Sequence, residues 1–149
     1  MQNVDDNKTT IEQEANVLKN ILHFGNSTVK QAMRSRLDVL AVDIQTSYAE
    51  LLDIIKKNNY SRIPVYEEHL DGIKGVLYVK DLIKYLNEKE DFDWQSLIRP
   101  PFMIYEDEKL EDLLHIFKSK RIHLAVVVDR DYGGVSGIIT MEDVLEEVT

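Results

Sequence analysis

The chain has 149 residues, of which 44% are hydrophobic and 30% are charged, a composition typical of one ordinary globular domain or two small ones. Its 27 acidic and 18 basic residues give a formal net charge of −9, which argues against a nucleic-acid partner. The absence of cysteine excludes disulfides, thiolate metal sites and cysteine nucleophiles. No apolar run approaches the ~18–20 residues of a membrane span and the polar start is no signal peptide, so we expect the chain as given to be soluble.

The first predicted element is an amphipathic helix over Ile11–Phe24, followed by Gly25 as the residue expected just past its end. Four apolar residues share one face of it: Ile11, Ala15, Leu18 and Leu22. Because the charges on its polar face are mixed, we expect a packing or dimerisation helix rather than one that lies on a membrane.

The rest of the chain repeats itself. A shift of 62 residues places Val39–Leu86 on Pro101–Val148 without a gap, with 8 identities in 48 positions and apolar residues falling on apolar ones. Each copy is predicted to run strand, helix, strand, turn, strand, helix. In the first copy these elements are Val39–Val42, Ser47–Asn58, Ile63–Tyr66, a turn at Asp71-Gly72, Ile73–Leu77 and Val79–Leu86. In the second copy they are Phe102–Ile104, Lys109–Lys120, Leu124–Val128, Val135–Ile139 and Met141–Val148.

A unit of about 50 residues has too small a core to be stable alone. We therefore predict an α+β fold in which two β-α-β-β-α units pack sheet against sheet as a pseudo-two-fold pair with two clefts. Residues 1–27 form an N-terminal linker and helix, 28–88 the first unit, and 89–149 the second unit with its linker. That linker, Asn87–Arg99, is charged and turn-like, and we expect Trp94 to anchor it between the units.

The segment Gly137-Ile-Ile-Thr140-Met-Glu-Asp143 joins a buried strand directly to a helix. Thr140 is placed to cap that helix, with Asp143 three residues later. The N–H groups and dipole of a helix N-terminus favour a phosphate, to which a threonine hydroxyl can donate. An aspartate one turn into the helix can accept both hydroxyls of a ribose, and Gly137 permits another backbone or a ligand to approach closely. A plain helix cap explains the same residues equally well.

The pattern Gly-x-x-Thr-x-x-Asp at the end of tandem β-α-β-β-α units resembles that of the CBS domain pair, or Bateman module. The resemblance covers roughly residues 28–149. Three motifs make it similar to the CorC/HlyC (haemolysin-C-like, CNNM-type) proteins: Tyr60-Ser-Arg-Ile-Pro-Val65, His123-Leu-Ala-Val-Val-Val-Asp129 and Thr140-Met-Glu-Asp-Val-Leu-Glu-Glu147. The stretch Phe92-Asp-Trp-Gln-Ser-Leu97 is similar to the gliding-motility-associated branch.

The resemblance implies a site for an adenosine nucleotide such as ATP or AMP, crossed between the two units. Asp143 would bind the ribose and Thr140 the phosphate. Tyr60, Ser61, Arg62 and Pro64 would line the base and phosphate edge, with Arg34 and Val42 near the adenine. Arg62 would supply the cation for a polyphosphate, although a salt bridge is an alternative role for it. Any Mg²⁺ is expected to arrive with the phosphates rather than at a dedicated protein site.

The first unit departs from the pattern at Gly75-Val-Leu-Tyr78-Val-Lys-Asp81. Tyr78 cannot cap a helix as threonine does, and its ring is expected to fill the cleft. The facing loop, which begins at His123, has neither the arginine nor the proline of its counterpart. We therefore expect one nucleotide site per chain.

We find no nucleophile–base set and no phosphate-binding glycine loop, so an enzyme is not expected. The preferred hypothesis is a regulatory nucleotide-binding module that forms a homodimer through its CBS units. By resemblance, it would follow a membrane domain linked to divalent cation (Mg/Co) transport or efflux, at the cytoplasmic face of the inner (plasma) membrane. A structural dimerisation module with no ligand and an enzyme acting on a nucleotide are the alternatives.

Overall fold

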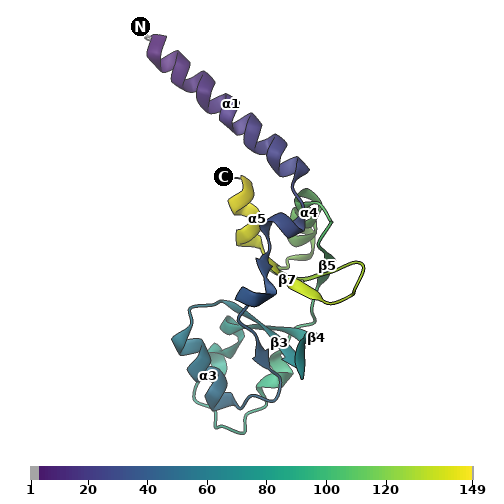
Figure 1. Cartoon of the computed structure of the whole chain (residues 1–149). Helices are drawn as coiled ribbons and strands as arrows, with labels where there is room; N and C mark the ends of the chain where they lie inside the picture. The colour runs from purple at the N-terminus through teal and green to yellow at the C-terminus, as the bar shows by residue number, and fades with distance from the viewer. Residues whose placement is uncertain (1–3, 149) are drawn as a thin grey trace.

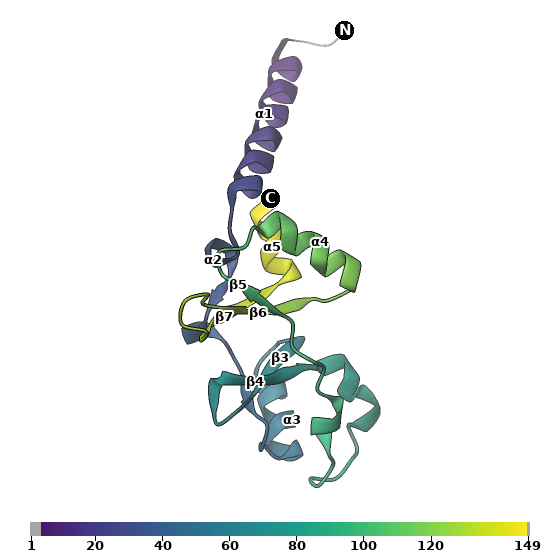
Figure 2. The same cartoon turned by 90° about the vertical axis from the view of Figure 1, so that its right-hand side faces the viewer.

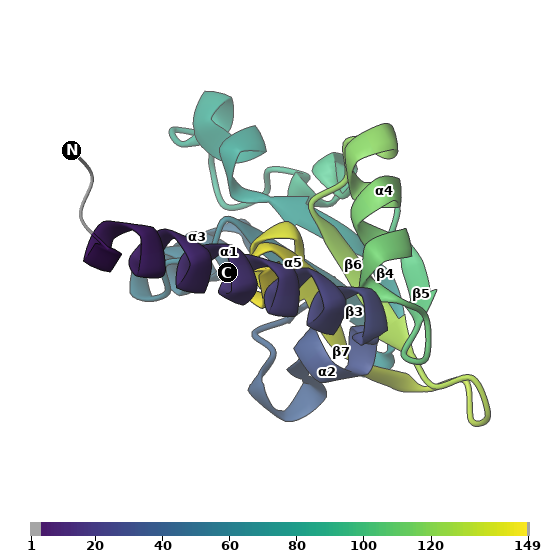
Figure 3. The ribbon, with the colours of Figure 1, turned by 90° about the horizontal axis from the view of Figure 1, so that it is seen from above.

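The computed structural model describes residues 4–148, in which a long leading helix projects from a body of two stacked units (Figure 1). Figure 2 shows four layers in the body, with helices outside and two sheets inside. Seen from above, the leading helix passes over α5 (Met141–Val148) and continues beyond the edge of the body (Figure 3). No helix in residues 4–148 is long and apolar enough to cross a membrane.

The leading helix, α1 (Val4–Asn26), begins earlier than predicted and runs through Gly25, so the prediction of Gly25 as its terminator is wrong. The side chain of Ser27 ends the helix instead, because its Oγ donates to the carbonyl of His23 at 2.8 Å. This bond satisfies one of the last carbonyls of α1, which have no partner within the helix.

The first unit is built on a three-stranded sheet of order β2-β3-β4. Its elements are β2 (Val42–Asp43), α3 (Tyr48–Lys57), β3 (Arg62–Glu67), β4 (His69–Tyr78) and two 3-10 helices, Val79–Tyr85 and Trp94–Leu97. The turn between β3 and β4 lies at Glu68, whose φ is 68°, and not at Asp71-Gly72, which is part of β4. Shifts in the β3–β4 register at Tyr66 absorb the extra residues that the sequence placed in a turn.

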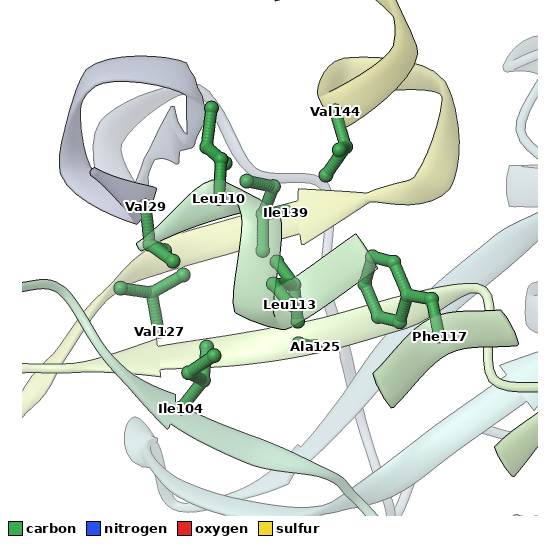
Figure 4. Close-up of a cluster of buried hydrophobic side chains, with 9 residues drawn as sticks. All are labelled: Val29, Ile104, Leu110, Leu113, Phe117, Ala125, Val127, Ile139 and Val144. Atoms are coloured by element: carbon green, nitrogen blue, oxygen red, sulfur yellow. The ribbon is translucent and has the colours of Figure 1, made fainter. Parts of the chain in front are cut away.

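The second unit is built on a four-stranded sheet of order β1-β7-β6-β5. Its elements are α2 (Val29–Ala32), β1 (Arg34–Ser35), β5 (Met103–Tyr105), α4 (Leu110–Lys120), β6 (Leu124–Val128), β7 (Val135–Thr140) and α5. A 3-10 turn, Arg36–Asp38, follows β1. Figure 4 shows the core of this unit, where Leu113 and Phe117 of α4 pack against the sheet beside Val144 of α5.

Each sheet is completed by the segment that leads into the other unit. Arg34 and Ser35, from the start of the first unit, pair with β7 of the second unit. Arg99, from the linker, bridges to Val76 of β4. Glycine makes both crossings possible, because a Cβ at Gly137 would collide with the carbonyl of Arg34 and one at Gly75 with the carbonyl of Arg99. The close backbone approach expected at Gly137 is therefore confirmed.

A third apolar cluster lies between the two sheets and holds the units together: Val76, Tyr78, Leu124, Val126, Val135 and Ile138. The predicted α+β pair with sheet packed against sheet is confirmed. The prediction that Trp94 lies between the units is wrong. Trp94 belongs to the core of the first unit, where its Nε1 donates to the carbonyl of Thr46 at 2.7 Å. Its neighbours in that core include Tyr48, which explains why an aromatic linker residue folds back onto the first unit.

The two repeats differ at their last helix. In the first unit the predicted helix Val79–Leu86 is a 3-10 helix that ends at Tyr85, whereas α5 of the second unit is a regular α-helix. Tyr78 at the start of the 3-10 helix makes no side-chain capping bond, as expected for a residue whose hydroxyl lies far from the backbone. The unmatched start leaves this segment without the cap that Thr140 gives α5.

Candidate functional site

A cleft of about 300 Å³ lies between the units, where the start of α5 faces the loop before β3. It is lined by Arg34, Asn59, Tyr60, Ser61, Arg62, Leu124, Ile138, Thr140, Glu142, Asp143 and Glu146. Six of the eight predicted site residues lie in this lining. The other two do not: Val42 is 3% exposed in the core of the first unit, and Pro64 is buried within β3.

Thr140 and Asp143 form a reciprocal capping box at the start of α5. The backbone N–H of Asp143 donates to Oγ1 of Thr140 at 3.2 Å, and the backbone N–H of Thr140 donates to Oδ2 of Asp143 at 2.9 Å. The box is the plain helix cap that the sequence suggested, but it uses only part of each side chain. The Thr140 hydroxyl still has its proton to donate, and Oδ1 of Asp143 still has its lone pairs to accept.

Arg62 and Glu142 close one side of the cleft from opposite units. Nη1 and Nη2 of Arg62 donate to Oε2 and Oε1 of Glu142 at 3.2 and 3.1 Å. The hydrogen bonding with Arg62 is the main cause that lowers the pKa of Glu142, so this carboxylate is charged at neutral pH. The guanidinium is the more enclosed partner, with 17% of its side chain exposed against 62% for Glu142. The salt-bridge alternative for Arg62 is thus present, and its guanidinium faces the cleft.

Arg34 and Tyr60 form the far edge of the cleft. The guanidinium carbon of Arg34 lies 5.8 Å from the centre of the Tyr60 ring, and its Nη1 donates to the phenol oxygen at 3.3 Å. Both groups are planar and more than a third of each residue is exposed, so either can stack on a flat ligand. The edge therefore suits an aromatic base, while the opposite edge carries the groups that suit a sugar and a phosphate.

The sequence did not single out Asn59, Leu124 or Ile138 as part of the lining. Asn59 directly precedes the Tyr60 motif, and Ile138 lies within the Gly137–Asp143 motif. Both motifs had been identified in the sequence, so either residue could have been added to the predicted lining. Glu142 and Glu146 were not assigned to the cleft from the sequence either. Their spacing of one helical turn beside Asp143 is the pattern that could have placed them on the cleft.

Comparison with known proteins settles the family. The CBS domain model matches residues 29–88 and 93–149. The chain belongs to the CBS-domain family. The two predicted repeats are its two CBS domains, and the resemblance inferred from the Thr140 motif is confirmed.

Hemolysin C of Brachyspira hyodysenteriae is 39% identical to this CBS pair over 137 residues, which are 92% of this chain and 50% of that protein. The magnesium and cobalt efflux protein CorC of Vibrio cholerae is 35% identical over 133 residues, 89% of this chain and 45% of that protein. The chain thus spans about half the length of these curated relatives.

Among solved structures, the CBS domain of a bacterial CNNM/CorC family Mg²⁺ transporter in complex with ATP is 34% identical. The two structures superimpose with a TM-score of 0.86, over 91% of this chain and 96% of that one. The fold of this CBS pair is therefore that of the CBS domains of CNNM/CorC transporters.

The other half of the CBS pair has its own hollow, of about 510 Å³, which shares Asn59–Arg62 with the first cleft. Its remaining lining is Tyr78, Val79, Lys80 and His123. Asp81, the counterpart of Asp143, is held by two hydrogen bonds of 3.0 Å from Arg99. The pairing raises the pKa of Arg99, and its guanidinium lies 3.9 Å from the centre of the Tyr78 ring.

This contrast separates the two aspartates chemically. Asp81 already has a cation, whereas no ion pair within 4.0 Å involves the Asp143 carboxylate among the residues whose side chains are described, 9–148. In the same described range, no three histidine, aspartate or glutamate side chains are grouped to hold a metal ion. A hollow of about 340 Å³ near Tyr105 has one carboxylate, Asp71, whose Oδ1 already accepts from Arg36 and from the N–H of Val135.

Proposed function

We propose that this CBS pair is a regulatory module that binds one adenosine nucleotide, ATP or AMP, in the cleft at the start of α5. The observation that carries the proposal is the convergence of Thr140, Asp143 and Arg62 on one cleft from two different units. A hydroxyl donor, a carboxylate with a free oxygen and a guanidinium are the three groups that a nucleoside phosphate requires. The ATP complex of the 34% identical CNNM/CorC relative supports the same ligand class.

In the proposed complex, Oδ1 of Asp143 accepts hydrogen bonds from the ribose hydroxyls, and the base stacks near Tyr60 and Arg34. The phosphate lies at the N-terminus of α5, where the Thr140 hydroxyl donates to it and the helix dipole favours negative charge. Arg62 and Ser61 bind the phosphate from the first unit. Mg²⁺ enters with the phosphates and keeps most of its waters, because no described protein group is arranged to hold it.

The proposed stoichiometry is one nucleotide per chain. Asp81 would have to give up two charge-assisted hydrogen bonds to Arg99 before it could accept from a ribose. Tyr78 also stands where Thr140 stands in the other half, and its buried ring takes the place of a hydroxyl donor. Both features favour the Asp143 cleft over the Asp81 cleft.

The CorC and Hemolysin C relatives support a wider role in a membrane protein linked to divalent cation (Mg/Co) transport or efflux. We propose that the pair lies at the cytoplasmic face of that protein's membrane domain and forms a homodimer through its CBS units. Nucleotide binding would favour one arrangement of the dimer over another, and that difference in affinity would drive the membrane domain. No catalytic step is proposed, and a purely structural dimerisation module is the competing hypothesis.

The deciding experiment is calorimetric titration of the chain with ATP, ADP and AMP, with and without Mg²⁺. We expect saturable binding of one nucleotide per chain, and Asp143→Ala to weaken it by about tenfold or more, because a charge-assisted contact to the ribose is lost. Asp81→Ala is the matched control, since it removes the equivalent carboxylate from the other half and should leave the affinity nearly unchanged.

Circular dichroism of both variants checks that each is folded. No binding of any of the three nucleotides to the folded wild-type chain would favour the structural dimerisation module. Equal losses in both variants would refute the assignment of the site to the Asp143 cleft.

A further inference from the structure

The part of α1 that projects from the body has a row of large apolar side chains in water. Ile11 is 64% exposed, Leu18 62% and Leu22 68%. Only the end of the helix packs on the body, where Phe24 joins the core of the second unit. Figures 1 and 2 show that the preceding turns stand clear of both units. A surface of this kind on a stable helix indicates a partner.

The apolar residues follow the spacing of a two-stranded coiled coil. Ile11, Ala15, Leu18 and Leu22 are separated by four, three and four residues, which places them on one narrow seam of α1. Val17 and Ile21, which are 56% and 54% exposed, extend the apolar surface on one side of this seam. Phe24 lies on the opposite side of the helix, so a partner on the seam would not meet the body.

Charges beside the seam match those of a second copy. Glu14 and Lys19 flank the seam on opposite sides and are five residues apart. In a parallel, in-register pair of helices these are the positions that face each other across the interface. Glu14 of each copy would therefore meet Lys19 of the other, and the pairing would occur twice by symmetry. Since α1 has four acidic and two basic residues, an anionic membrane surface is a poorer match.

We propose that α1 pairs with α1 of a second copy as a parallel coiled coil, with Ile11, Ala15, Leu18 and Leu22 as its seam. The inference does not depend on the nucleotide site, nor on contacts between CBS units. It joins two chains at the end of the molecule remote from the first unit. With only about three heptads available, the pair is expected to be weak alone and to act together with other contacts.

The absence of cysteine from the chain permits a direct test with a single introduced thiol. Leu18→Cys in the full chain is incubated with oxidised glutathione, and disulfide-linked dimer is followed on non-reducing gels. In a parallel pair residue 18 faces itself, so crosslinking should be about tenfold faster than for Asn20→Cys, which points away from the seam. Equal rates for the two variants would overturn the proposal.

Two further sets of variants test the direction and the register of the helix pair. An antiparallel pair would bring residue 15 opposite residue 18, so a mixture of Ala15→Cys and Leu18→Cys chains would crosslink faster than Leu18→Cys alone and refute the parallel arrangement. Within Leu18→Cys, adding Glu14→Lys should slow crosslinking, and adding Lys19→Glu as well should restore it. A double charge exchange that restored nothing would also count against the proposed register.

Discussion

Glu142 lies where it would compete with the phosphate of the proposed complex for Arg62. Its carboxylate occupies both outer nitrogens of the guanidinium, at 3.1 and 3.2 Å, from a position that is mostly open to water. The carboxylate takes two of the five N–H donors of Arg62, so a phosphate bound as proposed would share the guanidinium with it or displace it, and would lie beside its negative charge. In the proposed complex, Glu142 would thus be an intramolecular competitor of the phosphate.

Removing that charge should strengthen nucleotide binding. We expect Glu142→Gln to tighten ATP binding in the absence of Mg²⁺ by about two- to fivefold, which is the worth of one partly exposed ion pair. Titration calorimetry measures the change. Glu147→Gln is the control, because it makes the same change on the same helix at a residue that faces His23 of α1. Weaker binding by Glu142→Gln would mean that Glu142 helps to hold the ligand.

The sequence predicted contacts within the candidate site where the signal was local, and missed contacts where it was not. Thr140 and Asp143 are three residues apart, and the capping pattern alone predicted both bonds that they form. Arg62 and Glu142 are 80 residues apart, and nothing in either motif indicates their pairing. Val42 and Pro64 were assigned by resemblance, but the structure buries both away from the lining of the cleft.

At the scale of elements, the start of α5 serves stability and the proposed site together. Thr140→Val removes the oxygen that accepts from the Asp143 N–H, so it should lower the free energy of unfolding by about 1 kcal/mol. Urea unfolding followed by the fluorescence of Trp94, the single and fully buried tryptophan, measures the loss. The same variant should weaken nucleotide binding, because it also removes the donor to the phosphate.

Ser47→Ala is the control for that prediction. Ser47 caps α3 by accepting from the Glu50 N–H at 3.2 Å. The start of α3 is not part of the lining of the cleft. It should cost similar stability and leave nucleotide binding unchanged. A Thr140→Val chain as stable as wild type would show that the cap of α5 contributes little.

Elements with a strong period and a local cap were predictable, and elements fixed by contacts from elsewhere were not. The helix α3 and the strand β6 lie where the apolar pattern predicted them. The segment after Tyr78 has the same apolar pattern as α5 but forms a 3-10 helix. Strand β1 is only two residues long, which is too short to show an alternation of apolar and polar residues. It is a strand because it pairs with β7.

At the scale of the whole molecule, the repeat predicted two similar units, but the structure makes each depend on the other. Arg34 and Ser35, at the start of the first unit, complete the second sheet, and Arg99 of the linker bridges back to the first sheet. We therefore expect that fragments 1–88 and 89–149 do not fold separately but recover the native circular dichroism spectrum when mixed. A fragment that folded alone to a cooperative thermal transition would contradict this dependence.

The path from α1 to the cleft is short. Only Ser27 and Thr28 separate α1 from α2, and Met33 alone separates α2 from β1, which is hydrogen-bonded beside the strand that ends at Thr140. A tilt of the projecting helix would therefore reach the start of α5 through only a few residues. A nucleotide bound as proposed at the start of α5 would resist that tilt, and by reciprocity a force on α1 would change the affinity for the nucleotide. The projecting helix is in this sense a lever arm, and the cleft lies close to its fulcrum.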